Sequence, residues 1–447
     1  MTQNLSDLTE ALLSAAKRHG ADAADAMAVT NDSISVDVLK GALEQAGRSE
    51  ATEIGLRVLI GQRSASVSGS DLRAETIDTM AERAVQMARL APEDPYIGLA
   101  DPAQLTDRRD AEGLDLVDDH APAPADLEAA AAEAEAAALA VKGVAQVSSA
   151  SAAFGRTVIH LAMTNGFSGG YARTGHSLSC VAISGEGLEM ERDYHFDSRI
   201  HHADLISPQE IGRIAGERAI ARAKPRKPAT GTYPVLYDER VASGLIGHLV
   251  SAVNGAAIAR GASWLKDAMG EAVLPDHLSL TEDPLRPRVG GSKPFDAEGL
   301  PVARRDLVKD GVLQGWTLDL ATARKLGLTS TGSASRGVAG APSPGVTNLA
   351  LTQGDISRDQ MIRDMGTGLM ITSLIGSTIN PNTGDYSRGA SGFWIENGEI
   401  AYPVNECTIA GNLRDMLRRI VPANDARTHV GRVVPSLLVD GMTLAGG

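Results

Sequence analysis

The sequence predicts an α+β protein, with helices flanking an antiparallel sheet in the N-terminal region and a β-rich, mixed-sheet, barrel-like domain in the C-terminal region. Two patterns lead to this prediction. In the first half of the 447 residues, stretches with apolar residues at helical spacing are interleaved with stretches in which apolar and polar residues alternate. In the second half, short apolar runs are separated by glycine turns, which is typical of a partly closed sheet.

The first region, residues 1–100, is predicted to form a helix, antiparallel strands and a second helix. Apolar residues recur at the spacing of one helix face at both ends of the region, and they alternate with polar residues between these ends. The expected elements are a helix from Leu5 to His19-Gly20, strands around 33–38 and 54–60, a hairpin turn at 60–63 and a helix over 72–90.

The second region, residues 101–227, is expected to hold a proline-rich linker, an Ala/Glu-rich helix and a second β-rich segment. The helix spans 126–141, and its acidic face is interpreted as solvated rather than as a site. Alternation over 143–199 predicts strands, and a helix over 208–223 follows. The basic, proline-broken run 222–227 is interpreted as the linker to the C-terminal domain.

The third region, residues 228–447, is predicted to be the β-rich domain. A strand over 233–237 leads into a helix over 239–259, and a further helix is expected around 360–365. Glu396-Asn397-Gly398-Glu399 predicts a hairpin, because Asn-Gly readily adopts the two positive φ angles of a type I′ turn. The segment Tyr386–Gly389 is expected to be an exposed tip.

The composition excludes several classes of function. A net charge of −14 argues against binding to nucleic acid, which requires clustered Lys and Arg. No apolar run reaches the roughly 18 to 20 residues that a membrane span needs, and the N-terminus has the pattern of an amphipathic helix, so a cytoplasmic protein is expected. The two cysteines, Cys180 and Cys407, give no disulfide framework and suit a reducing compartment.

Several stretches of the second half carry a family resemblance. The run TGDYSRGASGFWIENGEIAYPV, followed by TIAGN, resembles the C-terminal part of the TldD/PmbA family, and within it the PmbA (or TldE) branch. The resemblance covers nearly the whole chain. Upstream, it is carried by NGAAIARGASWLKD (254–267), KPFDAEG (293–299), KLGLTSTGSASRG (325–337) and PSPGVTNL (342–349).

The resemblance implies a zinc site in the TldD branch, where one helix carries two histidines and a glutamate. Set against that helix, this chain has Ile246, Gly247 and Ser251 at the three functional positions. None of its ten histidines is followed by Glu, and no two are three or four residues apart. The segment Thr428–Val434, which resembles the segment that provides a cysteine ligand, has no cysteine. No metal is therefore expected in this chain, and zinc is expected in a TldD-type partner.

Other chemical candidates are weaker. His195, His201 and His202 with Asp197 and Asp204 form the densest set of potential ligands, but surface or capping roles are preferred, because the segment resembles a strand end and loop. Two further residues are interpreted as structural. His248 is a candidate core histidine on an apolar helix, and Cys407 follows Glu406, whose charge is expected to raise the thiol pKa.

Six polar residues remain as candidates for contact with a substrate or a subunit. We expect them to fix loop backbones and subunit contacts, with direct ligand contact as the alternative. They are Asn254, Arg260, Arg336, Asp385, Tyr386 and Arg388.

The resemblance implies a subunit without its own zinc site that forms a heterodimer with a TldD-type chain. The assembly would be a zinc-dependent peptidase for peptides or unfolded protein segments, which would bind by adding a strand to an open sheet edge. A homodimeric, non-enzymatic modulator of a protein such as DNA gyrase or a toxin/antitoxin component is the alternative. A peptidase with a non-standard metal site is a third possibility.

Overall fold

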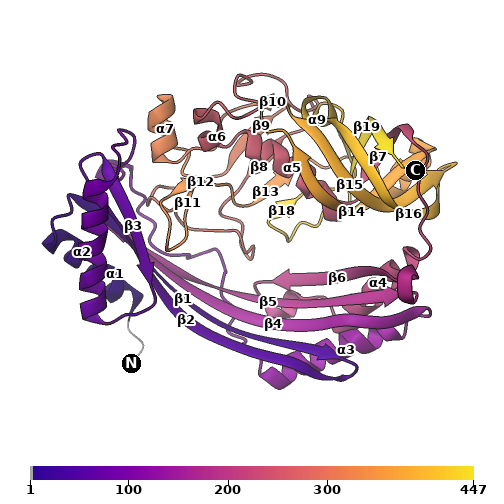
Figure 1. The fold of residues 1–447 in the computed structure, drawn as a ribbon, viewed down its shortest axis with the longest axis horizontal. Coiled ribbons are helices and arrows are strands. Elements are labelled where there is room, and N and C mark those ends of the chain that lie inside the picture. The colour runs from indigo at the N-terminus through magenta and orange to yellow at the C-terminus, as the bar shows by residue number, and fades with distance from the viewer. Residues whose placement is uncertain (1–3, 447) are drawn as a thin grey trace.

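The computed structural model describes residues 4–446. A long curved sheet built from the N-terminal half lies opposite a β-rich C-terminal half (Figure 1). Both halves combine helices with strands, as the sequence predicts.

The large sheet has six strands in the order β3-β2-β1-β4-β5-β6, and every neighbouring pair is antiparallel. The predicted first and second regions therefore contribute three strands each to one sheet, and the strands at 33–38 and 54–60 are parts of much longer ones. The strands are β1 (Ala23–Leu39), β2 (Ala42–Ile60), β3 (Arg63–Gly69), β4 (Val144–Met163), β5 (Ser168–Ser184) and β6 (Glu191–Arg199).

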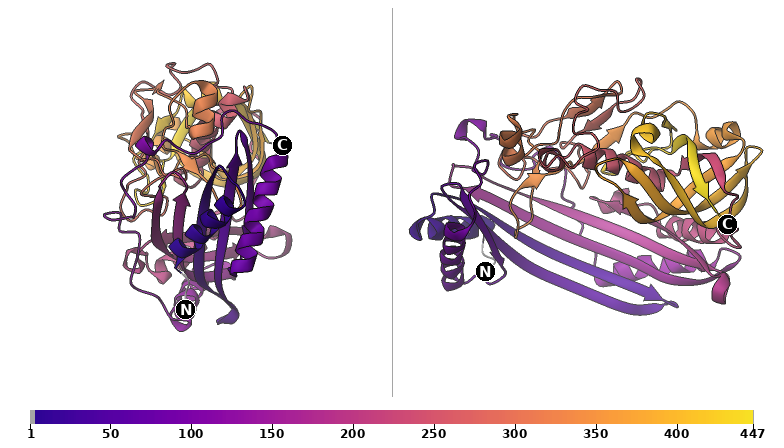
Figure 2. Two further views of the ribbon diagram at one scale, coloured as in Figure 1. Left: turned by 90° about the vertical axis from the view of Figure 1, so that its left-hand side faces the viewer. Right: turned by 45° about the horizontal axis from the view of Figure 1, so that its top comes forward.

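Four helices cover the convex face of this sheet, and the concave face is turned toward the C-terminal half (Figures 1 and 2). Helices α1 (Leu5–Arg18) and α2 (Ala74–Leu90) pack on one end, where every second residue of β1 from Ala24 to Ala28 is buried. Helices α3 (Pro124–Leu139) and α4 (Pro208–Ala221) pack on the other end, over Val36 and Val38. Alternation along the strands thus directs the odd-numbered residues of β1 to the concave face.

Helices α3 and α4 lie unusually close because their contact surface consists of alanine and glycine. A Cβ added at Gly212 would overlap the carbonyl oxygen of Ala134. The acidic face of α3 is not wholly solvated, which corrects the expectation. Glu135 is buried, and its carboxylate accepts hydrogen bonds from the backbone N–H groups of Lys40 (2.6 Å) and Gly41 (2.7 Å), at the β1–β2 turn.

The C-terminal half is built on a mixed sheet that closes into a barrel. The strand order is β16-β15-β14-β7-β19-β17, and pairing of β16 with β19 closes the ring; only β7 and β14 are parallel. The β15–β16 hairpin turns at Asn397 (φ 53°) and Gly398 (φ 78°), which confirms the predicted turn. The strands are β7 (Gly231–Tyr237), β14 (Gly368–Ile379), β15 (Asp385–Glu396), β16 (Glu399–Asn412), β17 (Val421–Pro422) and β19 (Leu437–Ala445).

Shorter elements surround the barrel. A five-stranded sheet has the order β10-β9-β8-β13-β18, and β11 pairs with β12 in a separate hairpin. These strands are β8 (Leu280–Glu282), β9 (Arg305–Lys309), β10 (Val312–Leu313), β11 (Ala334–Ser335), β12 (Ser343–Pro344), β13 (Leu349–Leu351) and β18 (Arg432–Val433). Three short helices also belong to this half, α7 (Leu320–Leu326), α8 (Arg358–Met365) and α9 (Leu413–Leu417).

The helix predicted over 239–259 is interrupted, and this is a correction. It forms α5 (Glu239–Ala252) and α6 (Gly255–Ala259). Asn254 is extended, and its side chain accepts the N–H of Ala256, which starts the second helix. The Gly255 N–H bonds to the carbonyl of Thr317, so a contact distant in sequence sets the break.

A buried ion triad joins the two halves. Arg336, beside β11, pairs with Asp25 of β1, and Asp25 also accepts hydrogen bonds from Arg57 of β2 at 2.5 and 2.6 Å. The side chains of Asp25, Arg57 and Arg336 are 0%, 6% and 1% exposed. The backbone next to Arg336 rests directly on β2, where a Cβ at Gly55 would overlap the carbonyl of Val338.

None of the helices in residues 4–446 is long and apolar enough to cross a membrane.

Gly212→Ala is expected to lower the free energy of unfolding by at least about 2 kcal/mol, because the new methyl group has no space against α3. Gly244→Ala in α5 is the matched control, since no atom lies within 4 Å of a Cβ there. Its higher helix propensity should leave stability unchanged or raise it by up to about 1 kcal/mol. Urea titration followed by circular dichroism measures both, and equal effects would contradict the close contact.

Asp25→Ala is expected to cost about 3–5 kcal/mol, because it leaves two buried guanidinium groups without their carboxylate. Asp78→Ala removes an exposed carboxylate that pairs with Arg18 and should leave the urea midpoint unchanged. A similar loss of unfolding free energy in both variants would show that the buried triad contributes no more to stability than an exposed ion pair. The same titration provides the comparison.

Candidate functional site

Helix α5 carries the positions at which the family resemblance places metal ligands. Ile246 is buried in the barrel core, and Ser251 uses its hydroxyl to donate to the Gly247 carbonyl at 2.9 Å. The segment Thr428–Val434, which resembles the cysteine-bearing segment of the TldD branch, lies next to this helix. A Cβ at Gly247 would be 3.3 Å from a terminal nitrogen of Arg432. The fold therefore brings together the two segments that the sequence comparison selected.

This arrangement does not fit a zinc ion. Gly247 offers no side chain, Ile246 is a hydrocarbon and the Arg432 guanidinium is a permanently charged donor without a lone pair. Zinc requires thiolate, imidazole or carboxylate ligands. Across residues 4–446, no group of three or more His, Cys, Asp or Glu side chains is placed so that it could hold a metal ion.

The histidine and aspartate residues around β6 are engaged in hydrogen bonds, ion pairs and ring contacts with other residues and, within the described chain, do not converge on one metal site. Burial lowers the pKa of His195 to about 4, with nearby arginines adding to the effect. The individual contacts are His195 with Arg218 (2.9 Å), Asp197 with Arg199 (2.8 Å) and His429 (3.4 Å), Asp204 with Arg288 (3.2 Å), His201 with Asp115 (3.1 Å) and His202 with the ring of His120 (4.6 Å between centroids).

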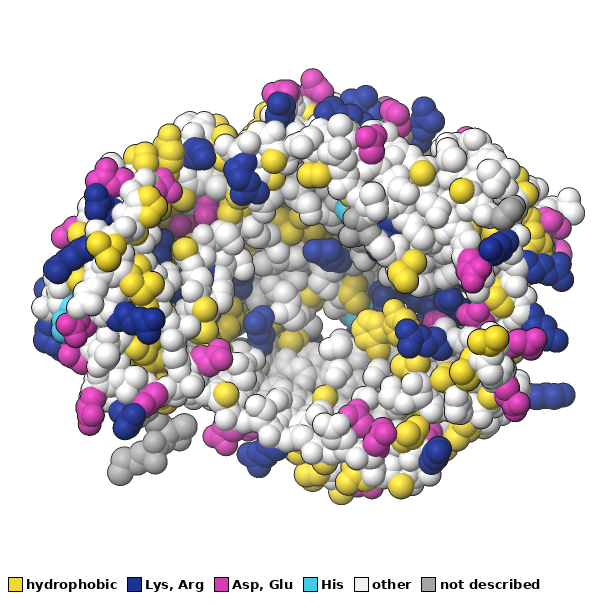
Figure 3. Space-filling model, in the orientation of Figure 1, with side chains coloured by type: hydrophobic (Ala, Val, Ile, Leu, Met, Phe, Trp, Pro, Cys, Tyr) yellow, Lys and Arg dark blue, Asp and Glu magenta, His cyan; other side chains and the backbone are white. Residues whose placement is uncertain are grey.

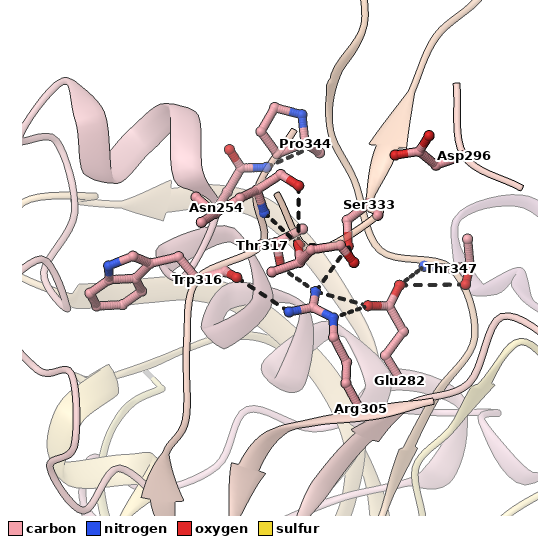
Figure 4. Close-up of polar contacts among 12 residues, drawn as sticks. Asn254, Glu282, Asp296, Arg305, Trp316, Thr317, Ser333, Pro344 and Thr347 are labelled. Atoms are coloured by element: carbon pink, nitrogen blue, oxygen red, sulfur yellow. Dashed lines mark hydrogen bonds and ion pairs between the residues drawn. The ribbon is translucent and has the colours of Figure 1, made fainter. Parts of the chain in front are cut away.

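A polar network joins the loops that carry the family resemblance (Figure 4). Arg305 of β9 pairs with Glu282 of β8 at 2.9 Å. The guanidinium also donates to the Thr317 and Ser333 hydroxyls at 3.1 and 3.2 Å. Nearby, Asn254 donates its side-chain amide to the Pro344 carbonyl at 2.9 Å. The network holds the 325–337 and 342–349 loops in place.

Sequence reasoning missed Glu282 and Arg305. Each lies beside other charged residues, Glu282 next to Asp283 and Arg305 next to Arg304, and no spacing connects positions 282 and 305. The available signal was indirect, since a charge buried in the fold needs a partner. Asn254, by contrast, is one of the six predicted candidates, and its bond to Pro344 fixes a loop, while contact with a substrate or a subunit stays a prediction.

Two carboxylic acids of the KPFDAEG stretch are buried beside this network. Asp296 accepts three backbone N–H bonds, at 2.8 to 3.1 Å, and burial raises its pKa. Glu298 accepts the N–H of Leu320 at 2.8 Å. Burial, and then the charge of Asp296, raise the Glu298 pKa to about 8. Glu298 is therefore largely protonated at neutral pH, and both groups brace loops.

The predicted tip at Tyr386–Gly389 is wrong, because these residues lie within β15. Tyr386 is 3% exposed, its ring packs 5.7 Å from that of His248, and burial raises its pKa. Asp385 is exposed at the start of the strand and accepts from Thr383 (2.6 Å) and Asn412 (3.1 Å). Closure of the barrel by β19 encloses the Tyr386 side chain.

The surroundings of His248 and Cys407 differ from those that the sequence suggests. His248 is half-buried, its Nε2 has no hydrogen-bond partner within residues 4–446, and burial lowers its pKa. Burial raises the pKa of Cys407 to about 11. The expectation that Glu406 raises it is incorrect, because Glu406 is exposed and pairs with Lys227 at 3.3 Å. The thiol donates to the Ala390 carbonyl at 3.2 Å instead.

Two hollows separate the concave face of the large sheet from the C-terminal half (Figure 3). The smaller, about 470 Å³, lies between β1, β4 and β5 and the loops around 291–297 and 334–338. The larger, about 1220 Å³, lies between β5 and β6 and the barrel strands β14, β15 and β16. Arg388 and Thr372 border the larger hollow, and each has a buried side-chain atom without a partner in the described chain.

The predicted residues thus occupy different places. Arg336 borders the smaller hollow and Arg388 the larger one. Asn254 lies in the loop network, and Arg260 is exposed at the end of α6. The structure does not gather them into one cluster.

Family models match three segments of the chain. They are described as PmbA/TldA metallopeptidase domain 1, central domain and C-terminal domain, and they match residues 24–88, 118–223 and 230–446. Together they cover most of both halves.

Curated relatives agree with this assignment. The chain is 38% identical over 427 residues to Metalloprotease PmbA of Escherichia coli O157:H7, covering 95% of this chain and 92% of the relative. It is 35% identical to the Metalloprotease PmbA homolog of Haemophilus influenzae, covering 88% and 85%.

Solved structures share the fold along almost the full length. A putative modulator of DNA gyrase from Bacteroides thetaiotaomicron superposes with a TM-score of 0.91 at 27% identity, covering 99% of this chain and 98% of that one. TldE from Thermococcus kodakarensis superposes with a TM-score of 0.85 at 19% identity, covering 98% and 100%, which shows the fold alone. Together with the family models and the curated relatives, these matches establish that the chain belongs to the PmbA/TldD metallopeptidase family, in its PmbA branch.

Proposed function

We propose that this chain is the subunit without a zinc site in a two-chain peptidase, whose TldD-type partner holds the zinc and carries out hydrolysis. The assembly acts on peptides and unfolded protein segments. Both cysteines are free thiols buried in the fold, which suits work in the cytoplasm.

The observation that supports this division of labour is the local chemistry of α5. The helix and the 428–433 segment keep their neighbouring positions, but a glycine and a guanidinium stand where ligands would be required. The Arg432 guanidinium repels a metal cation, and Gly247 has no side chain with which to bind one. In this proposal, a TldD-type partner that keeps the metal ligands supplies the zinc site that this chain does not have.

The substrate path in this proposal follows the concave face of the large sheet. Strand β6 is an edge of that sheet and borders the larger hollow. Tyr194 and Phe196 on β6 are 47% and 44% exposed, and their rings lie 6.1 Å apart. An extended chain that adds to β6 forms main-chain hydrogen bonds with little dependence on sequence and places apolar side chains on these rings.

The six candidate residues take different roles in this proposal. Arg388 contacts substrate in the larger hollow, and Asp385 and Tyr386 hold the strand that positions it. Asn254 and Arg336 fix loops. Arg260 is exposed and belongs to a subunit contact, either with the TldD-type chain or with a second copy of this one.

The test is a proteolysis assay with this chain alone, the TldD-type chain alone and the mixture, using fluorescently labelled casein as an unfolded substrate. Cleavage is expected in the mixture and should stop when 1,10-phenanthroline removes zinc. This chain alone should give no cleavage with or without added zinc. Robust, chelator-sensitive cleavage by this chain alone would refute the division of labour.

A second function, modulation of a protein such as DNA gyrase, is favoured by the description of the Bacteroides relative. Affinity purification of the tagged chain from cell extract separates the two. An equal amount of a TldD-type chain is expected in the eluate. Recovery of gyrase subunits or a toxin/antitoxin component in its place would favour the modulator.

A further inference from the structure

The smaller hollow has one apolar wall formed by strands of the large sheet. Its volume of about 470 Å³ is typical of sites for small molecules or one to two residues of a peptide. Because alternate residues of a strand share a face, β1, β4 and β5 each present a row of side chains to it. The apolar side chains of this wall are Met27, Val29, Ile159, Leu161 and Tyr171, and Phe295 of the 291–297 loop packs against Tyr171 with 5.7 Å between ring centroids.

Three cations border the hollow, Lys293 and Arg336 on the opposite wall and Arg173 on β5. Lys293 donates to the Ala334 carbonyl at 3.0 Å and forms no ion pair with a described residue, although an ammonium group has three donors. Arg173 donates to the Gly290 carbonyl at 3.0 Å and likewise has no ion pair with a described residue. Arg336 uses one terminal nitrogen for Asp25, and its other one, Nη2, is buried without a partner within residues 4–446.

Within the described chain, neither carboxylate that lines the hollow forms an ion pair with these cations, although the charge of Asp296 partly offsets the lowering of the Lys293 pKa by burial. Asp296 already accepts three backbone N–H bonds, and burial raises its pKa. Glu53 lies on β2 and is exposed to solvent. Buried donors without acceptors are costly, so the hollow suits an anion with an apolar body. A carboxylate attached to a hydrocarbon side chain meets both conditions, whereas a phosphate would leave the apolar wall uncovered.

The concave face also connects this hollow to the larger one. Along β5, Tyr171 and Arg173 line the smaller hollow, while Val181 and Ile183 line the larger. The residues between them on the same face, at 175, 177 and 179, are Gly, Ser and Ser. Eight residues of strand separate Arg173 from Val181, or about 26 Å at 3.3 Å per residue. An extended peptide can therefore run between the hollows over small side chains.

We propose that the smaller hollow binds the carboxyl-terminal residue of a peptide, with its carboxylate at Lys293 and Arg336 and its side chain against Tyr171 and Phe295. This inference rests on the proposed function in taking peptides as the ligands. It gives the substrate a direction, with its carboxyl end at the smaller hollow and its preceding residues leading toward the larger one.

The test measures binding of a fluorescein-labelled hexapeptide that ends in leucine, as the free acid and as the carboxamide, to the purified full-length chain by fluorescence anisotropy. The acid is expected to bind at least about tenfold more tightly, because only its carboxylate satisfies the unpaired cations. Lys293→Met should abolish the preference for the acid, and Lys293→Arg should retain it. Lys309→Met, at an exposed lysine of β9, is the matched control and should behave as the parent.

Lys293→Met is not expected to unfold the protein, because it replaces a buried ammonium, whose pKa burial lowers, by a hydrocarbon of similar length. Its thermal midpoint should equal or exceed that of the parent. Equal affinity for acid and amide, no binding of either, or a preference that survives in Lys293→Met would overturn the carboxylate site. The proteolysis assay with the TldD-type chain decides the subunit role independently.

Discussion

The contact between Asp25 and two guanidinium groups is the constraint on which the arrangement of the molecule depends. Arg57 and Asp25 belong to the large sheet, while Arg336 comes from the opposite half. A carboxylate that is wholly buried needs compensation by charge, and Arg57 and Arg336 both provide it to Asp25. The triad stabilises the docking in which the 334–338 loop lies over β2, and this docking sets the shape of the smaller hollow.

Much of the fold follows from local patterns, and the failures have a common cause. The N-terminal helices, the alternating strands and the Asn397-Gly398 turn depend on neighbouring residues, so the sequence predicts them. The break at Asn254 and the burial of Tyr386 depend on the Thr317 carbonyl and on closure by β19, far along the chain. Local periodicity carries no information on such contacts.

In the candidate site, too, features that depend on local sequence could be predicted, and features that depend on distant contacts could not. The absence of a metal-binding side chain at positions 246, 247 and 251 of α5 can be read directly from the sequence, and the structure places residues 428–434 next to this helix. Glu282 with Arg305, and Asp25 with Arg336, could not be paired in advance, because each side chain alone resembles an ordinary surface charge. The sequence predicts that the pKa of the Cys407 thiol is raised, which is the direction in the structure. The cause differs, because the thiol is buried in the barrel and this burial cannot be predicted from neighbouring residues.

The distribution of charge around the two hollows and beside α5 favours anions over metal cations. The chain carries a net charge of −14, yet Lys293, Arg173 and Arg388 face its two hollows without forming ion pairs with residues of the described chain. At α5, Arg432 adds a further cation beside Gly247. In a partly enclosed space such cations attract anions more strongly than they would at the open surface. In the proposed division of labour, the partner would therefore hydrolyse the peptide bond, while the cations of this chain would hold the charged end of the peptide.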